Sequence, residues 1–236
     1  MFYKMKAIEQ LYAMQKTRIV GFGSSNTECC YNHAYVPGWL NWVDFGLRKI
    51  FGRFFTIINS GISGQTSTQL IDRFSDDVEL YKPHLVFLTI GGNDSNPSNN
   101  LSPELFRDNL IKIIKECQKI PNCEIVLQTY YCPILEKLPE AHAKKFLQYM
   151  GIITHVALES KVEIFDHLPQ WQQLQQSIGV ATYEKELMDD PMHLSALGNQ
   201  LWAYNILNRL AAKELEKINK YFLPVMQYQN ILTINT

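Results

Sequence analysis

The chain has 236 residues, of which 46% are hydrophobic and 19% are charged. Its 22 lysine and arginine residues nearly balance its 23 aspartate and glutamate residues. A chain of this length fits one large domain or two small ones, and the balanced charge excludes the basic surface that is typical of nucleic-acid binders. We therefore expect a globular protein that acts on small molecules and has no nucleic-acid partner.

The N-terminal residues do not resemble a signal peptide. The chain begins with MFYKMKAIEQLYAMQK, which contains neither a continuous apolar run nor a small-residue cleavage site. No later stretch approaches the roughly 18 apolar residues that span a bilayer. These features predict a cytoplasmic protein without a membrane span.

Short apolar runs alternate with amphipathic segments along the whole chain. The runs that predict strands are residues 18–22, 54–58, 84–90, 124–130 and 162–165. The segments with helical spacing are residues 39–51, 66–81, 102–119, 138–160 and 194–221. Strands that alternate with helices are typical of βαβ units and a parallel sheet. We therefore predict an α/β protein, a flavodoxin-like three-layer α/β/α sandwich with about five parallel strands.

No internal repeat, low-complexity tract or Gly/Ser linker divides the chain. We expect residues 1–17 to form a helical N-terminal extension and residues 18–236 to form a single domain. The first three predicted strands end in Gly-Ser-Ser, Asn-Ser-Gly and Gly-Gly-Asn. Because ligands bind beyond the carboxyl ends of the strands in open parallel sheets, these loops are where we expect the functional site.

Four short segments at such positions resemble the sequence blocks of one family. They are Phe22-Gly-Ser-Ser-Asn-Thr27, Asn59-Ser-Gly-Ile-Ser-Gly-Gln65, Gly91-Gly-Asn-Asp94 and Asp190-Pro-Met-His193. In this order they are similar to the G-D-S, loop glycine, G-x-N-D and D-x-x-H blocks of the SGNH/GDSL hydrolases. The resemblance extends from residue 18 to about residue 203. It implies a serine hydrolase that cleaves carboxylic esters and needs no cofactor.

The resemblance assigns a catalytic triad to Ser25 as nucleophile, His193 as general base and Asp190 as the acid that orients the histidine. Each assignment also has a physical reason. A serine hydroxyl is a weak nucleophile until a base takes its proton, and a carboxylate can hold the imidazole in the required tautomer. Asp189 is adjacent, but the D-x-x-H spacing favours Asp190.

The resemblance also assigns an oxyanion hole. Its donors are the backbone N–H groups of Ser25 and Gly64 and the side-chain amide of Asn93. Such donors stabilise the negative charge that develops on the substrate oxygen during acyl transfer. Glycine allows a loop to approach a ligand closely, and asparagine offers N–H donors without a charge.

Taken one at a time, these segments have simpler interpretations. Ser24 and Ser25 are also preferred helix-capping residues, and Gly-Gly-Asn-Asp and Asp-Pro are common in turns. One position departs from the family, because Ser24 stands where its members usually have aspartate. The change alters the polarity beside Ser25 and places a second serine next to it.

The remaining histidines and cysteines do not have the spacing of a metal site. His33, His84, His142, His155 and His167 form no HExxH or Cys/His pattern, so we expect no bound metal. The cysteines Cys29, Cys30, Cys117, Cys123 and Cys132 are odd in number and form no CxxC pair, which favours reduced thiols. Several aromatic residues flank the strand ends, and we interpret most of them as core packing. They are Tyr31, Tyr35, Trp39, Tyr130 and Tyr131.

The expected reaction is hydrolysis of a small-molecule ester through an acyl-enzyme. The predicted loop 93–100 is polar and offers no long apolar lid, which favours acetyl or other short acyl groups. Two alternatives use the same segments: an acyltransferase that passes the acyl group from Ser25 to an alcohol or sugar, and a binding module without turnover. A flavin-binding flavodoxin is a third and weaker alternative, which the colour of the protein tests.

Overall fold

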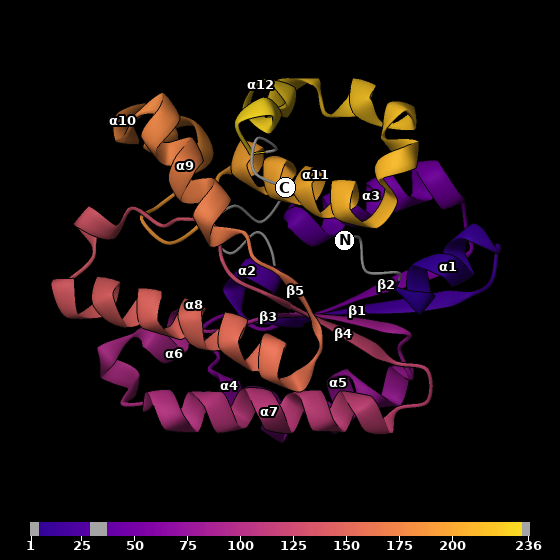
Figure 1. Ribbon diagram of the computed structural model, residues 1–236, viewed down its shortest axis with the longest axis horizontal. Coiled ribbons are helices and arrows are strands. Elements are labelled where there is room, and N and C mark those ends of the chain that lie inside the picture. Colours follow the sequence, from indigo (N-terminus) through magenta and orange to yellow (C-terminus); the bar gives the residue numbers. More distant parts are fainter. Residues whose placement is uncertain (1–4, 29–36, 233–236) are drawn as a thin grey trace.

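The computed structural model describes residues 5–28 and 37–232, and its centre is a parallel sheet with helices around it (Figure 1). The strands are β1 (Thr17–Gly23), β2 (Phe55–Gly61), β3 (Leu85–Thr89), β4 (Glu124–Gln128) and β5 (Glu163–Phe165). All pair in parallel in the order β2-β1-β3-β4-β5. This is the flavodoxin-like order, in which the direction of winding reverses between β1 and β3. The predicted fold class is confirmed.

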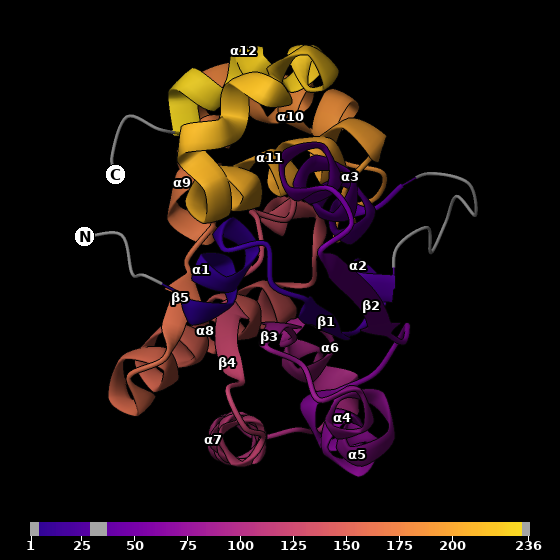
Figure 2. The same ribbon diagram turned by 90° about the vertical axis from the view of Figure 1, so that its right-hand side faces the viewer.

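Helices cover both faces of the sheet. The longer helices are α3 (Trp39–Phe51), α7 (Pro103–Lys119), α8 (Glu140–Ser160), α9 (Leu168–Ile178), α10 (Val180–Leu187), α11 (Ala196–Ala211) and α12 (Leu223–Leu232). The shorter helices are α1 (Lys6–Tyr12), α2 (Ser25–Glu28), α4 (Ser67–Asp72), α5 (Phe74–Asp77) and α6 (Gly92–Ser95). Figure 2 shows α3 and α11 on one side of the strands and α4, α5 and α7 on the other.

The central strands are apolar because both of their faces are covered. Every residue of β3 is buried, and in β1 only Arg18 is exposed. Continuous apolar runs of this kind are typical of strands buried between two helical layers. Within one helical layer, α3 and α11 are also tightly packed: a Cβ atom at Gly46 of α3 would lie 2.4 Å from Leu207 Cδ1 of α11. Glycine at this position therefore lets the two helices approach each other closely.

The prediction of one helix over residues 66–81 is wrong. The segment forms α4, α5 and the 3-10 segment Glu79–Tyr81. The break between α4 and α5 falls at Arg73, whose φ of −109° and ψ of 7° leave the helical region. Arg73 turns its guanidinium towards the sheet, where it bonds the ends of two strands, and these contacts outweigh continuation of the helix.

The C-terminal part also differs from the prediction. Instead of one helix over residues 194–221, α11 ends at Ala211, and the 3-10 segments Ala212–Lys217 and Asn219–Tyr221 lead into α12. Ala211 interrupts the helix with φ −145° and ψ 42°. Phe222 and Val225 beyond it are fully buried, so the apolar C-terminal segment packs on its own domain.

Helices α9 and α10 were not predicted. Their first part is rich in glutamine, and only Leu168, Trp171 and Leu174 of α9 are buried. Such a narrow apolar face gives a weak periodic signal. The division of the chain at residue 17 stays a prediction, with α1 lying before that boundary and packing against β1.

Candidate active site

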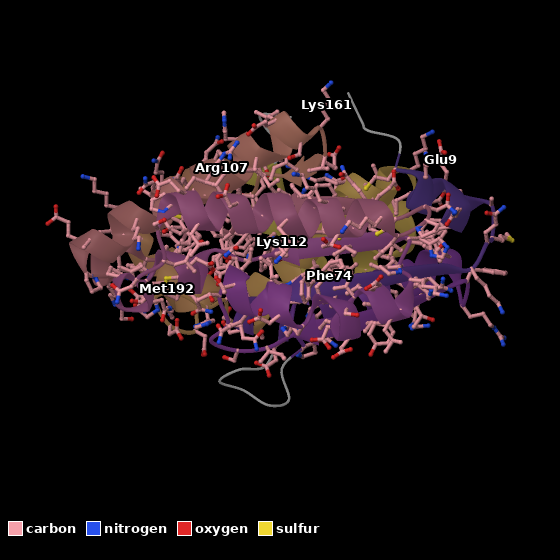
Figure 3. All side chains as sticks on the ribbon, turned by 90° about the horizontal axis from the view of Figure 1, so that it is seen from below. Glu9, Phe74, Arg107, Lys112, Lys161 and Met192 are labelled. Atoms are coloured by element: carbon pink, nitrogen blue, oxygen red, sulfur yellow. The ribbon has the colours of Figure 1, made fainter. Side chains whose placement is uncertain are left out.

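The predicted site residues lie at the carboxyl end of the sheet. Met192, the neighbour of His193, lies at the end of the molecule opposite to Glu9, which precedes β1 (Figure 3). Ser25 follows the end of β1, and Asn93 follows the end of β3. Because the winding reverses between these two strands, their loops diverge and leave room for a ligand.

Ser25 is presented by a tight turn from β1 into α2. A Cβ atom at Gly23 would lie 2.3 Å from the Thr89 carbonyl oxygen and 2.4 Å from Thr27 Oγ1, so only glycine fits at this point. The chain then turns at once, and Ser25 becomes the first residue of α2. The side chain is directed to the sheet edge, where the residue is 8% exposed.

Ser25, His193 and Asp190 form a continuous hydrogen-bonded chain. Ser25 Oγ lies 3.0 Å from His193 Nε2, and His193 Nδ1 lies 2.7 Å from Asp190 Oδ2. The other carboxylate oxygen, Oδ1, accepts hydrogen bonds from the backbone N–H groups of Met192 (2.7 Å) and His193 (2.8 Å). Hydrogen bonds within the short D-x-x-H loop therefore hold its conformation and fix the orientation of the imidazole.

This environment keeps the Asp190 carboxylate ionised. Burial opposes ionisation, but the hydrogen bonds from the His193 ring and from the two backbone N–H groups lower the pKa of Asp190 to about 2. A carboxylate in this state can accept a hydrogen bond from the Nδ1–H group of His193 and stabilise an imidazolium ion.

A small cavity lies beside Ser25. Its volume is about 120 Å³, and its lining includes Ser25, His193, Asn26, Asn93, Asn96 and His142. Asn93 reaches the cavity from the first turn of α6, where its side-chain N–H donates to the Gln65 carbonyl at 2.9 Å. One N–H of the amide is held in this way, and the amide has a second N–H to offer.

Gly64 differs from the other two residues of the predicted oxyanion hole. It adopts a φ of +78°, which favours glycine, and it is exposed. It is not among the described residues that line the cavity. Ser25 and Asn93 thus share one cavity, while Gly64 is adjacent to Gln65, whose carbonyl accepts from the Asn93 amide. The catalytic roles of all three residues stay predictions.

Comparison with known proteins identifies the family. Residues 22–201 match the model of the GDSL-like lipase/acylhydrolase family. The chain belongs to this family. The predicted family is confirmed, and with it the placement of the chain among the carboxylic ester hydrolases of the SGNH/GDSL type.

The individual relatives share only limited sequence identity with the chain. An uncharacterized lipoprotein of Bacillus subtilis, YqeF, is 31% identical over 138 residues, and the match spans 56% of each chain, so about half of that protein's length. The acetylxylan esterase Axe2 from Geobacillus stearothermophilus has a TM-score of 0.70 at 21% identity, over 84% of this chain and 95% of that one. An α/β hydrolase enzyme from the metagenome of Lake Arreo, Spain, gives the same TM-score and identity over 83% and 95%. The two structures share the fold.

Ser24, which departs from the GDSL block, is buried beside Tyr130. Ser24 is 1% exposed, and its Oγ lies 3.4 Å from the hydroxyl of Tyr130, which is itself fully buried. Ser24 and Ser25 therefore have different partners, Tyr130 for the first and His193 for the second.

One arginine that the sequence did not single out connects the loops of this family site. Arg73 donates to the carbonyls of Gly23 (2.9 Å) and Ser60 (2.8 Å), at the ends of β1 and β2. Its Nε also donates to the side-chain oxygen of Gln65 at 2.5 Å. Since the Gln65 carbonyl accepts from the Asn93 amide, Arg73 contacts both the end of β1, which precedes Ser25, and the loop that holds Asn93. No local feature of the sequence indicates this role.

The other histidines lie away from Ser25, except for His142, which lines the cavity beside it. His84 lies at the amino end of β3, His155 is exposed on α8, and His167 is fully buried. Within residues 5–28 and 37–232, no group of three or more side chains is arranged to hold a metal ion. The predictions for Cys29, Cys30, Tyr31, His33 and Tyr35 fall outside the described residues.

The remaining predictions concern thiols, aromatic packing and location. Cys117, Cys123 and Cys132 are free thiols, and Trp39, Tyr130 and Tyr131 are buried in the core. In the part of the chain that the structure describes, no helix has the length and apolarity that crossing a membrane requires. The cytoplasmic location stays a prediction, because one relative is named a lipoprotein.

Proposed function

We propose that the protein hydrolyses carboxylic esters by two-step acyl transfer from Ser25. The observation that carries the proposal is the chain of contacts from Ser25 Oγ to His193 Nε2 (3.0 Å) and from His193 Nδ1 to Asp190 Oδ2 (2.7 Å). In the first step, His193 takes the hydroxyl proton while Ser25 Oγ attacks the ester carbonyl. The C–O bond to the alcohol then breaks, and the proton on His193 passes to the leaving oxygen.

The second step returns the enzyme to its starting state. A water molecule gives its proton to His193 and attacks the acyl-enzyme, and Ser25 leaves with that proton as the free carboxylic acid forms. Asp190 keeps the proton of the neutral imidazole on Nδ1 throughout, so that Nε2 can act as the base. The Ser25 N–H, the Gly64 N–H and the Asn93 amide are the proposed donors to the oxyanion in both steps.

The proposed role of Asn93 predicts a loss of kcat. Asn93→Ala should lower kcat by roughly 10²- to 10³-fold, as removal of one oxyanion donor does in other enzymes. KM should change little, because the hydrogen bond strengthens mainly in the transition state. Steady-state kinetics with one ester measures both constants.

Asn99→Ala is the matched control for this variant. Its side-chain amide donates to the Asn93 backbone carbonyl at 2.7 Å, so the substitution disturbs the same turn but leaves the Asn93 amide in place. We expect at most a few-fold change in kcat. A pure KM effect in Asn93→Ala would make Asn93 a substrate-positioning residue instead.

The proposed substrate is an acetyl or other short-chain acyl ester. The cavity beside Ser25 measures about 120 Å³ and is lined largely by polar side chains, which suits a small acyl group. Long acyl chains need extended apolar burial, worth about 0.8 kcal/mol per methylene. The fold is shared with Axe2, an acetylxylan esterase, which by its name removes acetyl groups.

Acetyl, butyryl and decanoyl esters of one alcohol test this preference. We expect kcat/KM to be highest for acetyl or butyryl and to fall for decanoyl. A steady rise towards decanoyl would contradict the proposal and indicate a long apolar site. Addition of a sugar or alcohol acceptor to the same assay distinguishes hydrolysis from acyl transfer, since transfer yields a new ester in place of the free acid.

A further inference from the structure

His142 shares the catalytic cavity, but the proposed mechanism gives it no task. It lies in the first turn of α8 and lines the same cavity as Ser25 and Asn93. The start of α8 reaches the cavity because α8 packs against α6, the short helix that carries Asn93. His142 therefore comes from a helix that contributes nothing to the triad.

The ring of His142 is held in its neutral form. Burial lowers the pKa of His142 below its ordinary value of 6.5, and the positive charge of Lys145 lowers it further. The backbone of Gly92 raises the pKa of His142, but this effect is smaller than that of burial. The imidazole is thus uncharged at neutral pH, with one nitrogen as donor and the other as acceptor.

One ring nitrogen of His142 lacks a hydrogen-bond partner in the described part of the chain. Nε2 of His142 is buried and has no hydrogen-bond partner among the described residues. In the neutral tautomer that carries its proton on Nδ1, Nε2 is a hydrogen-bond acceptor. Buried polar atoms in folded proteins almost always have a partner, and one that lacks it at a binding cavity is a candidate contact for a ligand.

We propose that His142 is a specificity-determining residue whose Nε2 accepts a hydrogen bond from a hydroxyl group of the ester. This inference rests on the proposed function. No lysine, arginine, aspartate or glutamate is among the described residues that line the cavity, while Asn26 and Asn96 add polar surface, which suits a neutral hydroxylated substrate. The small volume of about 120 Å³ places that hydroxyl within a few atoms of the ester carbonyl.

The hydroxyl can belong to either half of the ester, and three small substrates distinguish the two. Ethyl acetate has no hydroxyl, ethyl glycolate carries one on the acyl side, and 2-hydroxyethyl acetate carries one on the alcohol side. The measured quantity is the ratio of kcat/KM for each hydroxylated ester to kcat/KM for ethyl acetate. Differences in intrinsic reactivity between the esters are the same for every variant, so they cancel when the ratios of two variants are compared.

Two variants of His142 distinguish loss of the hydrogen-bond acceptor from loss of the rest of the ring. His142→Leu removes the acceptor, and His142→Gln restores one through its amide oxygen. His155→Leu is the matched control, since His155 lies on the same helix with a side chain that is 74% exposed. We expect His142→Leu to lower one of the two ratios by about five- to tenfold, the range of a single neutral hydrogen bond. His142→Gln should recover part of the loss, and His155→Leu should match the parent.

Equal ratios in the parent and in folded His142→Leu, for both hydroxylated esters, would overturn the proposal. If His142→Leu does not fold, His142→Ala provides the same comparison. A parent that hydrolyses none of the three esters also counts against it, and labelling with a fluorophosphonate then shows which proposal has failed. If Ser25 is labelled, the serine mechanism is supported and only the role of His142 is contradicted. If Ser25 is not labelled, both proposals are contradicted.

Discussion

Ser25→Ala is expected to abolish covalent labelling by a fluorophosphonate and to lower kcat by roughly 10⁴- to 10⁶-fold, as loss of the nucleophile does in other serine hydrolases. The physical reason is that Ser25 Oγ is the oxygen that lies 3.0 Å from His193 Nε2. Alanine leaves the base without a proton to take and the ester without an attacking atom. Intact-mass spectrometry and steady-state kinetics measure the two effects.

Ser24→Ala is the matched control, because it removes the same hydroxyl one residue earlier. Ser24 Oγ faces the Tyr130 hydroxyl at 3.4 Å, and adjacent residues direct their side chains differently as the chain leaves β1. The variant should therefore remain labelled and retain most of its kcat. Peptide mapping that located the adduct on Ser24, or an adduct that persisted in folded Ser25→Ala, would show that the nucleophile was assigned to the wrong serine. A folded parent that resists labelling altogether would favour the binding-module alternative.

The parts of the site that could be predicted from the sequence are those with local motifs. Ser25 and Asn93 each follow a strand directly, and in a parallel sheet all such ends meet at one edge. His193 and Asp190 are three residues apart, so a single loop fixes their geometry. The strands themselves were predictable because burial on both faces leaves a continuous apolar run, as in Leu85–Thr89.

The parts that were missed depend on contacts between distant segments. Arg73 bonds the Gly23 carbonyl, 50 residues earlier in the chain, and nothing in its own neighbourhood indicates that partner. His142 enters the cavity only because α8 packs on α6, which is a property of the assembled fold. For the same reason the break at Arg73 could not be read from helical spacing, since the strand-end carbonyls that the side chain bonds are supplied by other segments.

The last expectation concerns the acid of the triad. Asp190→Asn should lower kcat by roughly 10⁴-fold, the size of the effect when the corresponding aspartate of a serine protease triad is replaced. The Asp190 carboxylate accepts hydrogen bonds from His193 Nδ1 and from the Met192 and His193 backbone N–H groups. In the variant, the amide oxygen can keep the backbone bonds, which turns the NH₂ group towards His193 Nδ1. The imidazole proton then moves to Nε2, and the ring can no longer accept the proton of Ser25.

The pH dependence of kcat in Asp190→Asn and the control variant Asp189→Asn test the role of Asp190. Because the pKa of Asp190 is lowered to about 2, its carboxylate stays ionised as the pH falls from 8 to 5, and the parent does not lose the acid over this range. The kcat of Asp190→Asn should therefore be lower than that of the parent across this whole pH range. We would measure kcat at each pH and check folding by circular dichroism. Asp189→Asn should change kcat at most a few-fold, since the contacts to the His193 ring and N–H come from Asp190. A loss in Asp189→Asn as large as that in Asp190→Asn would transfer the role of the orienting acid to Asp189.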